Sequence, residues 1–286
     1  MKIRIVLLLS VLVALASGAF LVTAQDEDVR GAFMTTRPKP NEPRKPASKP
    51  THRRPKPSPS PGPVVDGGST SGATHKGPRM GLGLTLFMRD STGLAVRTDP
   101  TRAFHKGDHV RVLLETNADG YLYVFNTTND GPPVMIYPDP ELDEAGNYLQ
   151  AHVPFEIPSS TAPEERLRWF TFDQNAGAEK LFFVFSRQPL SGVPIEDDLV
   201  SLCRNDKSKC PWRPATATWA AIVKGLSEGV NTSKGRVDGP LSAGEKDGVA
   251  RGIGLNRDDP EPSLIMLSAS TNKNILIATL ELAHEG

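Results

Sequence analysis

A serine in the second half of the chain lies in the pattern that many serine hydrolases use for their nucleophile. Residues 225–229 read Gly-Leu-Ser-Glu-Gly, which matches the G-x-S-x-G elbow and would make Ser227 the nucleophile of an ester hydrolysis. Asp259 and His284 follow Ser227 in the chain order of such a triad. The elbow needs a strand before the serine and a helix after it. Here the preceding residues have a helix-like pattern and the following ones are rich in turn residues, which favours a chance match.

Two cysteines offer either a disulfide or part of a metal site. Cys203 and Cys210 enclose six residues, a spacing too wide for a C-x-x-C redox motif. A zinc site would need two further ligands, and no histidine lies nearby in the sequence. In an exported chain such a pair favours a local disulfide over a metal site or free thiols.

Two other groups of residues have the chemistry of metal ligands but not the spacing. His105 and His109 are four apart, yet the Lys-Gly-Asp turn between them breaks the helix that would bring them together. The loop 139–147 carries four carboxylates, those of Asp139, Glu141, Asp143 and Glu144. It lacks the glycine and the closing glutamate of an EF-hand calcium loop. We therefore expect solvated turn and loop residues here, and no metal or cofactor.

Aromatic residues are concentrated in two segments that read as strands. They are Tyr121, Tyr123, Phe125, Phe183 and Phe185. An exposed aromatic face for ligand binding is one interpretation. Their strict alternation within the strands favours packing in a core instead.

The first 24 residues have the composition of a secretory signal peptide. Lys2 and Arg4 precede a leucine-rich apolar stretch, and Val-Thr-Ala at 22–24 supplies a cleavage site after Ala24. An uncleaved membrane anchor remains the alternative, since the apolar stretch is just long enough to span a bilayer. Both interpretations predict an exported protein that is periplasmic, envelope-bound or secreted.

Residues 25–80 read as a disordered tether. Prolines recur through residues 38–63, interleaved with lysine and arginine, and little there could bury apolar surface. Residues 25–80 hold 11 basic and 5 acidic side chains, whereas residues 81–286 hold 20 and 28. The basic tether could contact an anionic surface, or serve only as a spacer. The zero net charge of the whole chain argues against a nucleic-acid binder.

Residues 81–286 read as strands separated by turns, without strong helical periodicity. This pattern predicts an all-β domain, an antiparallel Ig-like β-sandwich. The strands at 121–125, 181–185 and 275–282 are apolar on both faces, so we expect another layer to cover the outer face. Short helices at 195–202 and 219–226 are the candidate cover, and 226–262 reads as a long exposed loop.

Several short motifs together resemble a bacterial family known only as domain of unknown function 4384. They are Phe-His-Lys-Gly-Asp at 104–108, Asn-Ala-Asp-Gly-Tyr-Leu-Tyr-Val-Phe at 117–125, Ile-Tyr-Pro at 136–138, Gly-Ala-Glu-Lys-Leu-Phe at 177–182 and Phe-Ser-Arg-Gln-Pro-Leu at 185–190. The resemblance covers about residues 84–190, with a last strand at 275–283. It implies an extracytoplasmic β-rich module without known catalytic residues. The long insert at 191–274 departs from the family pattern.

These observations predict a non-enzymatic, exported module: a tethered β-sandwich that binds an envelope protein or an envelope polymer. The loop 139–147 and the segment 226–262 are the candidate binding surfaces, because binding residues concentrate on loops. Two alternatives stay open, a secreted serine hydrolase that uses Ser227 and a purely structural spacer domain.

Overall fold

The computed structural model describes residues 26, 28–40, 42, 78–140, 146–224, 226, 229–271 and 273–285. The predicted signal peptide (1–24), most of the predicted tether (43–77) and Ser227 lie outside the described residues. None of the described helices has the length and apolar character needed to cross a membrane.

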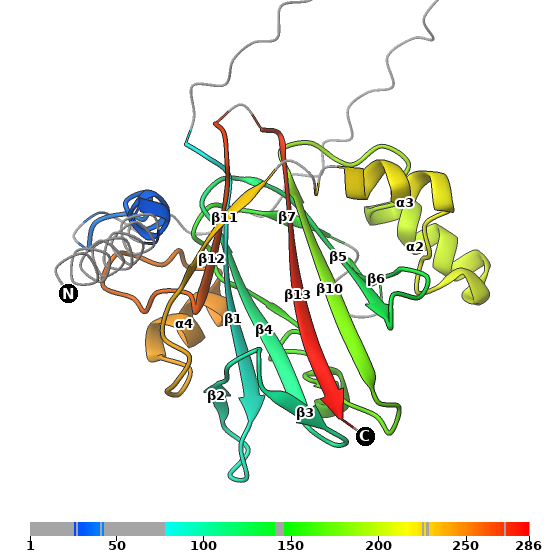
Figure 1. Ribbon diagram of the computed structural model, residues 1–286, viewed down its shortest axis with the longest axis horizontal. Coiled ribbons are helices and arrows are strands. Elements are labelled where there is room, and N and C mark those ends of the chain that lie inside the picture. Colours follow the sequence, from blue (N-terminus) through cyan, green and yellow to red (C-terminus); the bar gives the residue numbers. More distant parts are fainter. Residues whose placement is uncertain are drawn as a thin grey trace, which may run out of the picture.

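The domain is built from two β-sheets that face each other (Figure 1). In the first sheet the order is β11 (Val230–Lys234), β12 (Leu264–Ser268), β1 (Gly81–Arg89), β4 (His109–Thr116) and β8 (Phe155–Ile157), with β2 (Ala95–Arg97) on β1 and β9 (Phe170–Thr171) on β4. In the second sheet it is β3 (Ala103–His105), β13 (Ile275–Glu285), β10 (Gly177–Ser186), β5 (Gly120–Thr128) and β6 (Val134–Tyr137), with β7 (Tyr148–Leu149) on β5. Among the described strands, β3 and β13 pair in parallel and all other pairs are antiparallel. The predicted antiparallel β-sandwich is confirmed at this level.

The turns between strands form where the sequence supplies residues that tolerate a positive φ. Gly107, at φ 88°, turns the chain from β3 into β4. Asn129 and Asp130, at φ 50° and 55°, join β5 to β6. Two successive residues with positive φ match the right-handed twist of paired strands.

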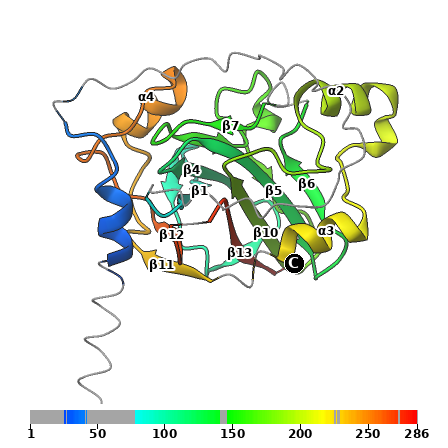
Figure 2. The same cartoon turned by 90° about the horizontal axis from the view of Figure 1, so that it is seen from above.

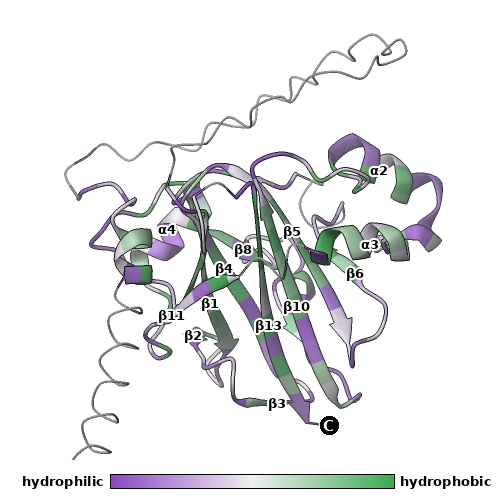
Figure 3. Ribbon diagram, turned by 45° about the horizontal axis from the view of Figure 1, so that its top comes forward, coloured by the Kyte–Doolittle hydropathy of each residue, from purple (hydrophilic) through white to green (hydrophobic). Residues whose placement is uncertain are grey.

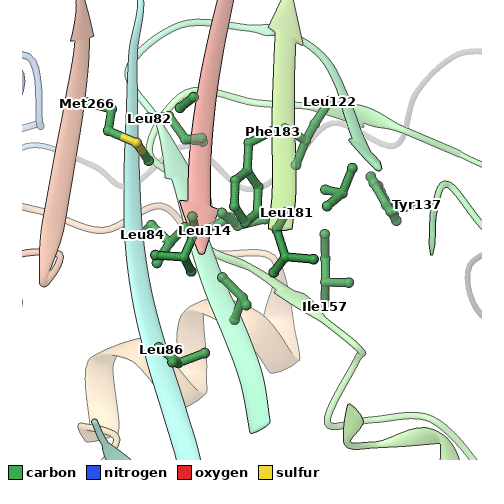
Figure 4. Packing of buried hydrophobic residues seen from close by; sticks show 14 of the residues in the cluster. Leu82, Leu84, Leu86, Leu114, Leu122, Tyr137, Ile157, Leu181, Phe183 and Met266 are labelled. Atoms are coloured by element: carbon green, nitrogen blue, oxygen red, sulfur yellow. The ribbon is translucent and has the colours of Figure 1, made fainter. Parts of the chain in front are cut away.

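The main core lies between the sheets and follows the alternation of the strands. Leu82, Leu84 and Leu86 of β1 are each at most 1% exposed. They point into the same layer as Leu181 and Phe183 of β10 (Figure 4). The period of two sends the intervening residues of each strand to the outer faces.

The outer face of the second sheet is covered by two helices from the insert, as predicted. They are α2 (Glu196–Asn205), followed by the 3₁₀ turn η2 (Lys207–Lys209), and α3 (Thr216–Val223). Tyr123 and Phe125 of β5 are 0% exposed beneath these helices. The Phe125 ring lies 5.2 Å from the ring of Trp219. Figure 2 shows α2 and α3 on one side of the sandwich and α4 (Ala243–Arg251) on the other.

The outer face of the first sheet is covered as well, and here the tether prediction needs correction. Residues 28–40, hereafter the amino-terminal segment, begin with a helical turn over 28–34 and pack on the sheet. Val29 and Phe33 are 0% exposed against Ile265 and Leu267 of β12. Val29 and Phe33 supply apolar burial, so this part of the stretch is ordered.

The segment 226–262 also differs from the exposed loop expected there. It contains β11, which pairs with β12, and α4, which lies over the first sheet. Ser242 and Glu245 form a capping box at the start of α4, and Gly252, at φ 61°, ends the helix. Leu241 is buried with Phe87 of β1. The few apolar residues of this segment are therefore enough to hold it on the domain, because the first sheet supplies the rest of the contact surface.

The predicted disulfide is present between Cys203 in α2 and Cys210 after η2. It closes the short loop that follows the helix covering Tyr123. We expect the double variant Cys203→Ser, Cys210→Ser to lose roughly 2–3 kcal/mol of unfolding free energy, because the open loop regains conformational freedom in the unfolded chain. Urea unfolding of the oxidised chain and of the variant measures this difference. A loss below about 1 kcal/mol would mean that the loop is already restricted without the bond.

Candidate functional site

A groove of about 370 Å³ opens between the sheets at the side where β13 faces β1 and β12. Its volume lies in the range of about 300–1,000 Å³ that is usual for ligand sites. The first sheet continues past β1 through β12 and β11. On the same side of β13 the second sheet has only the three-residue strand β3 among the described residues. The groove exists because one sheet extends beyond the other.

The groove has an apolar floor and a charged rim. Four leucines form the floor: Leu84, Leu86, Leu264 and Leu280. Asp99, Lys234 and Glu281 lie at the rim. The carboxylate of Asp99 accepts hydrogen bonds from the Thr101 backbone N–H at 2.8 Å and from the Thr101 hydroxyl at 2.7 Å. These bonds, with the nearby ammonium of Lys234, lower the pKa of Asp99, so it is ionised at neutral pH.

The hydroxyl groups of the groove wall take part in local structure. The Thr101 hydroxyl donates to Asp99, and the Ser263 hydroxyl donates to the backbone carbonyl of Arg236. The Ser263 backbone N–H donates to the Thr85 hydroxyl at 3.1 Å. Among the described lining residues, no histidine stands beside these hydroxyls. The arrangement is suited to holding a ligand by shape and charge.

Asp259 and His284, which the sequence suggested as triad residues, lie in separate parts of the fold. Gly225, Ser227 and Glu228 lie outside the described residues, but α3 precedes them and β11 follows. This helix-then-strand order is the reverse of a nucleophile elbow. Asp259 accepts from the Asn256 backbone N–H at 2.8 Å, between α4 and β12. His284 lies in β13 of the other sheet, its ring 5.0 Å from that of Phe172.

The two histidines considered as metal ligands lie on either side of a turn. His105 and His109 flank the Gly107 turn, and the His109 ring contacts the Gly107 carbonyl at 2.6 Å. Among the described residues no three of His, Cys, Asp or Glu gather as metal ligands. Residues 141–145, the centre of the acidic loop, lie outside the described residues.

The five aromatic residues are divided between two layers. Tyr123 and Phe125 lie beneath the helices, with Tyr121 packed at the edge of the same cluster. Phe183 and Phe185 lie in the core between the sheets. The alternation along each strand therefore favoured core packing correctly, and the residues form no common binding face.

A layer of buried charges beneath the amino-terminal segment and α4 was missed from the sequence. The Arg37 guanidinium donates to both carboxylate oxygens of Glu115 in β4, and a ring nitrogen of His152 lies 2.7 Å from the same carboxylate. A second buried pair joins Arg97 of β2 to Glu245 of α4. A cavity of about 10 Å³ lies between the two pairs, which is room for about one water molecule.

No local sequence pattern predicts these buried charges, because the residues come from five separate segments. Arg37 stands in a basic, proline-rich stretch, and Glu115 and Arg97 alternate with apolar residues as solvent-facing strand residues do. Charged residues are rarely buried without a partner. The only hint is that the outer face of β1 carries glycines. A Cβ atom on Gly83 would come 2.4 Å from Pro262 and 3.2 Å from Phe33, so these glycines permit the close approach of other segments.

Glu115 gives the stability of the protein an acid dependence. Burial raises the pKa of Glu115, but hydrogen bonds from His152 and Arg37 and the charge of Arg37 outweigh it, so the pKa lies below its ordinary value of 4.5. A carboxyl with a lowered pKa stabilises the fold above the unfolded-state pKa, and this contribution is lost as the pH falls through the folded-state pKa. We expect the unfolding free energy to fall below about pH 4.5. The fall should be shallower in Glu115→Gln, as measured by urea unfolding at stepped pH. Equal slopes in the two proteins would contradict this assignment.

Fold and groove together define a strand-rich, two-sheet sandwich protein with a ligand-sized opening at one edge. Residues 103–189 match the family model described as a domain of unknown function, DUF4384, which confirms the resemblance identified from the sequence. No curated protein matches the chain. No solved structure matches it either. The matched residues run from β3 to just beyond β10, whereas every described residue that lines the groove lies outside them.

Proposed function

We propose that this chain is an exported, non-catalytic binding module whose groove between the sheets holds part of a protein partner. The observation that carries the proposal is the groove itself, with its leucine floor and charged rim. Of the four leucines, Leu264 is half-buried and the other three are at most 6% exposed, so the groove offers a ligand a narrow apolar surface. A leucine floor favours a protein partner over an envelope polymer, because a polar or charged polymer gains little from burial against leucines.

We infer that the sandwich is an Ig-like variant. The order β13-β10-β5-β6 parallels the G-F-C-C′ sheet of that fold, and β1 beside β4 parallels strands A and B. The insert 191–274 would then lie in the F–G connection. Two of its strands, β11 and β12, widen the sheet that holds β1, and this widening produces the groove.

Two observations support export and a role without catalysis. The bond between Cys203 and Cys210 is of a kind that persists in oxidising compartments, in accord with the signal-peptide pattern at 1–24. The hydroxyls of Thr101 and Ser263 at the groove wall are engaged in a turn and in a backbone contact. We propose that residues 43–77, rich in proline and lysine, act as a spacer that presents the domain.

A variant that fills the groove tests the proposal. Val237 is half-buried at the groove wall, and Val237→Trp adds bulk there without removing a core residue. Envelope extracts are passed over the immobilised chain, over Val237→Trp and over Leu94→Trp, a control at a residue 56% exposed outside the groove. We expect the same proteins on the unaltered chain and the control, and at least about tenfold less on Val237→Trp. Equal retention by all three, or no reproducible retention, would contradict the proposal and favour a spacer.

A further inference from the structure

The groove is bordered by a length of β-strand that lacks a neighbour. β13 pairs with β10 from Ile275 to His284. On the other side of β13, β3 pairs only with Ala283, His284 and Glu285, near the C-terminal end in Figure 1. In the part of the chain that the structure describes, no strand pairs with this side of β13 before Ala283. Thr279, Leu280 and Glu281 from this length line the groove.

Exposed strand edges present alternate N–H and C=O groups that can pair with another chain, and proteins usually shorten or cover them. The other sheet edges here follow that rule. β8 has three residues and β11 has five. The edge of β6 is partly covered, because the Met135 N–H donates to the Trp212 carbonyl at 2.8 Å. The β13 edge is the long one, and it opens onto an apolar groove.

We propose that the groove receives an extended peptide strand of the partner protein, which pairs with β13 along residues 278–282 and lies over β1 and β12. This inference rests on the proposed function and specifies its ligand. Main-chain hydrogen bonds to the strand edge would supply affinity, and side chains entering the groove would supply specificity. The added strand would extend the second sheet beyond β13. It would then lie opposite the strands by which the first sheet is wider.

The side chains of β13 indicate what this peptide should look like. Apolar and polar residues alternate over residues 278–282 (Figure 3), with Leu280 buried and its neighbours Thr279 and Glu281 exposed. A paired strand alternates in the same sense. Its inward residues would meet the leucine floor, and its outward residues would lie beside Glu281. Opposite charges on paired strands are favourable, so we expect a lysine or arginine next to Glu281, also attracted by the ionised Asp99 at the rim.

The same requirements disfavour the proline-rich part of this chain as the occupant. Residues 43–63 contain a proline at intervals of two to five residues. Proline has no N–H to donate to a neighbouring strand. A partner segment with alternating apolar residues and a basic residue meets both the hydrogen-bonding and the charge requirement.

Random peptides displayed on phage, selected on the purified chain, test the inference. We expect the selected peptides to alternate apolar and polar residues with a basic residue, and to bind Val237→Trp at least about tenfold more weakly. Glu281→Lys should select acidic residues at that position. The matched reversal Glu164→Lys, at an exposed residue of another loop, should not alter the selection. N-methylation of alternate peptide amides should lower affinity at least about tenfold, because it removes the donors that pair with β13.

Hydrogen exchange separates the possible outcomes. Bound peptide should slow exchange of those amides within residues 278–282 that point away from β10, because the others are already paired with β10. Selected peptides could require an open groove, leave these amides unprotected and tolerate N-methylation. That result would contradict strand pairing but not binding in the groove. Protection, in the dilute free chain, of the amides that point away from β10 would identify a segment of the chain itself as the occupant. Protection that grows with protein concentration would identify a second copy. Either result overturns the inference, as does a failure to select any peptide whose binding depends on the groove. The experiment with envelope extracts tests the proposed function separately.

Discussion

Arg37→Ala is expected to lower the free energy of unfolding by about 3–5 kcal/mol, because it leaves a buried carboxylate without its cationic partner. The Arg37 side chain is 0% exposed and that of Glu115 is 3% exposed. Arg37 also donates to the backbone carbonyls of Asn256, Asp259 and Pro260. Truncation therefore removes the ion pair and the contacts that join the amino-terminal segment to the stretch before β12. Urea unfolding monitored by circular dichroism measures the loss.

Two further variants test whether the loss of stability comes from breaking the buried ion pair and not merely from removing a positive charge. Arg166→Ala removes an arginine whose ion pair with Glu164 is 73% and 58% exposed, and we expect a change below about 1 kcal/mol. Replacing both buried partners, Arg37→Met with Glu115→Leu, should recover much of the loss because no unpaired charge remains. A loss for Arg37→Ala no larger than that for Arg166→Ala would show that the amino-terminal segment does not dock in solution.

Phe125→Ala is expected to cost about 3–5 kcal/mol, the usual range for removing a buried phenylalanine. Phe125 is 0% exposed and packs between β5 and the insert, its ring 5.2 Å from Trp219 and 6.5 Å from Trp212. The cavity left behind would loosen α3 against the second sheet. The chain has three tryptophans, two of which lie here, so their fluorescence should shift to longer wavelength as water reaches them.

Leu94→Ala is the matched control, because Leu94 is 56% exposed and its truncation should change stability by less than about 0.5 kcal/mol. Phe125→Ala should shift the emission and lower stability together. If it left both unchanged, the insert would not cover this face of the sheet. If it lowered stability without an emission shift, the cavity would remain closed to water and the expectation for α3 would be wrong.

Much of the architecture was predictable because it depends on patterns of residues close together in the sequence. Alternation at Leu82, Leu84 and Leu86 identified the strand and the face that it turns to the core, although the structure buries both faces of β1. The Gly107 and Asn129 turns carried residues that tolerate positive φ. Strands with apolar residues on both faces required a covering layer, and the two short helices of the insert supplied it. The disulfide was predicted from the cysteine spacing and the predicted export alone.

The contacts on the first sheet could not be predicted in this way. Arg37 and Glu115 are 78 positions apart, and each lies in a sequence context typical of solvent-exposed residues. Val29 and Phe33 are two apolar residues ahead of a long proline-rich stretch, so composition masked their role. The weakly patterned segment 226–262 became ordered because β12 and the outer face of the first sheet offered it a surface.

Local sequence patterns account for the two-sheet sandwich, its turns, its disulfide and the resemblance to a domain of unknown function, because each of these depends on residues close together in the chain. Long-range packing sets which segments cover the sheets, which charges are buried and where the second sheet stops short of the first. The groove and the unpaired length of β13 arise from strand order and sheet width. Those properties depend on long-range pairing, which no local pattern of residues specifies.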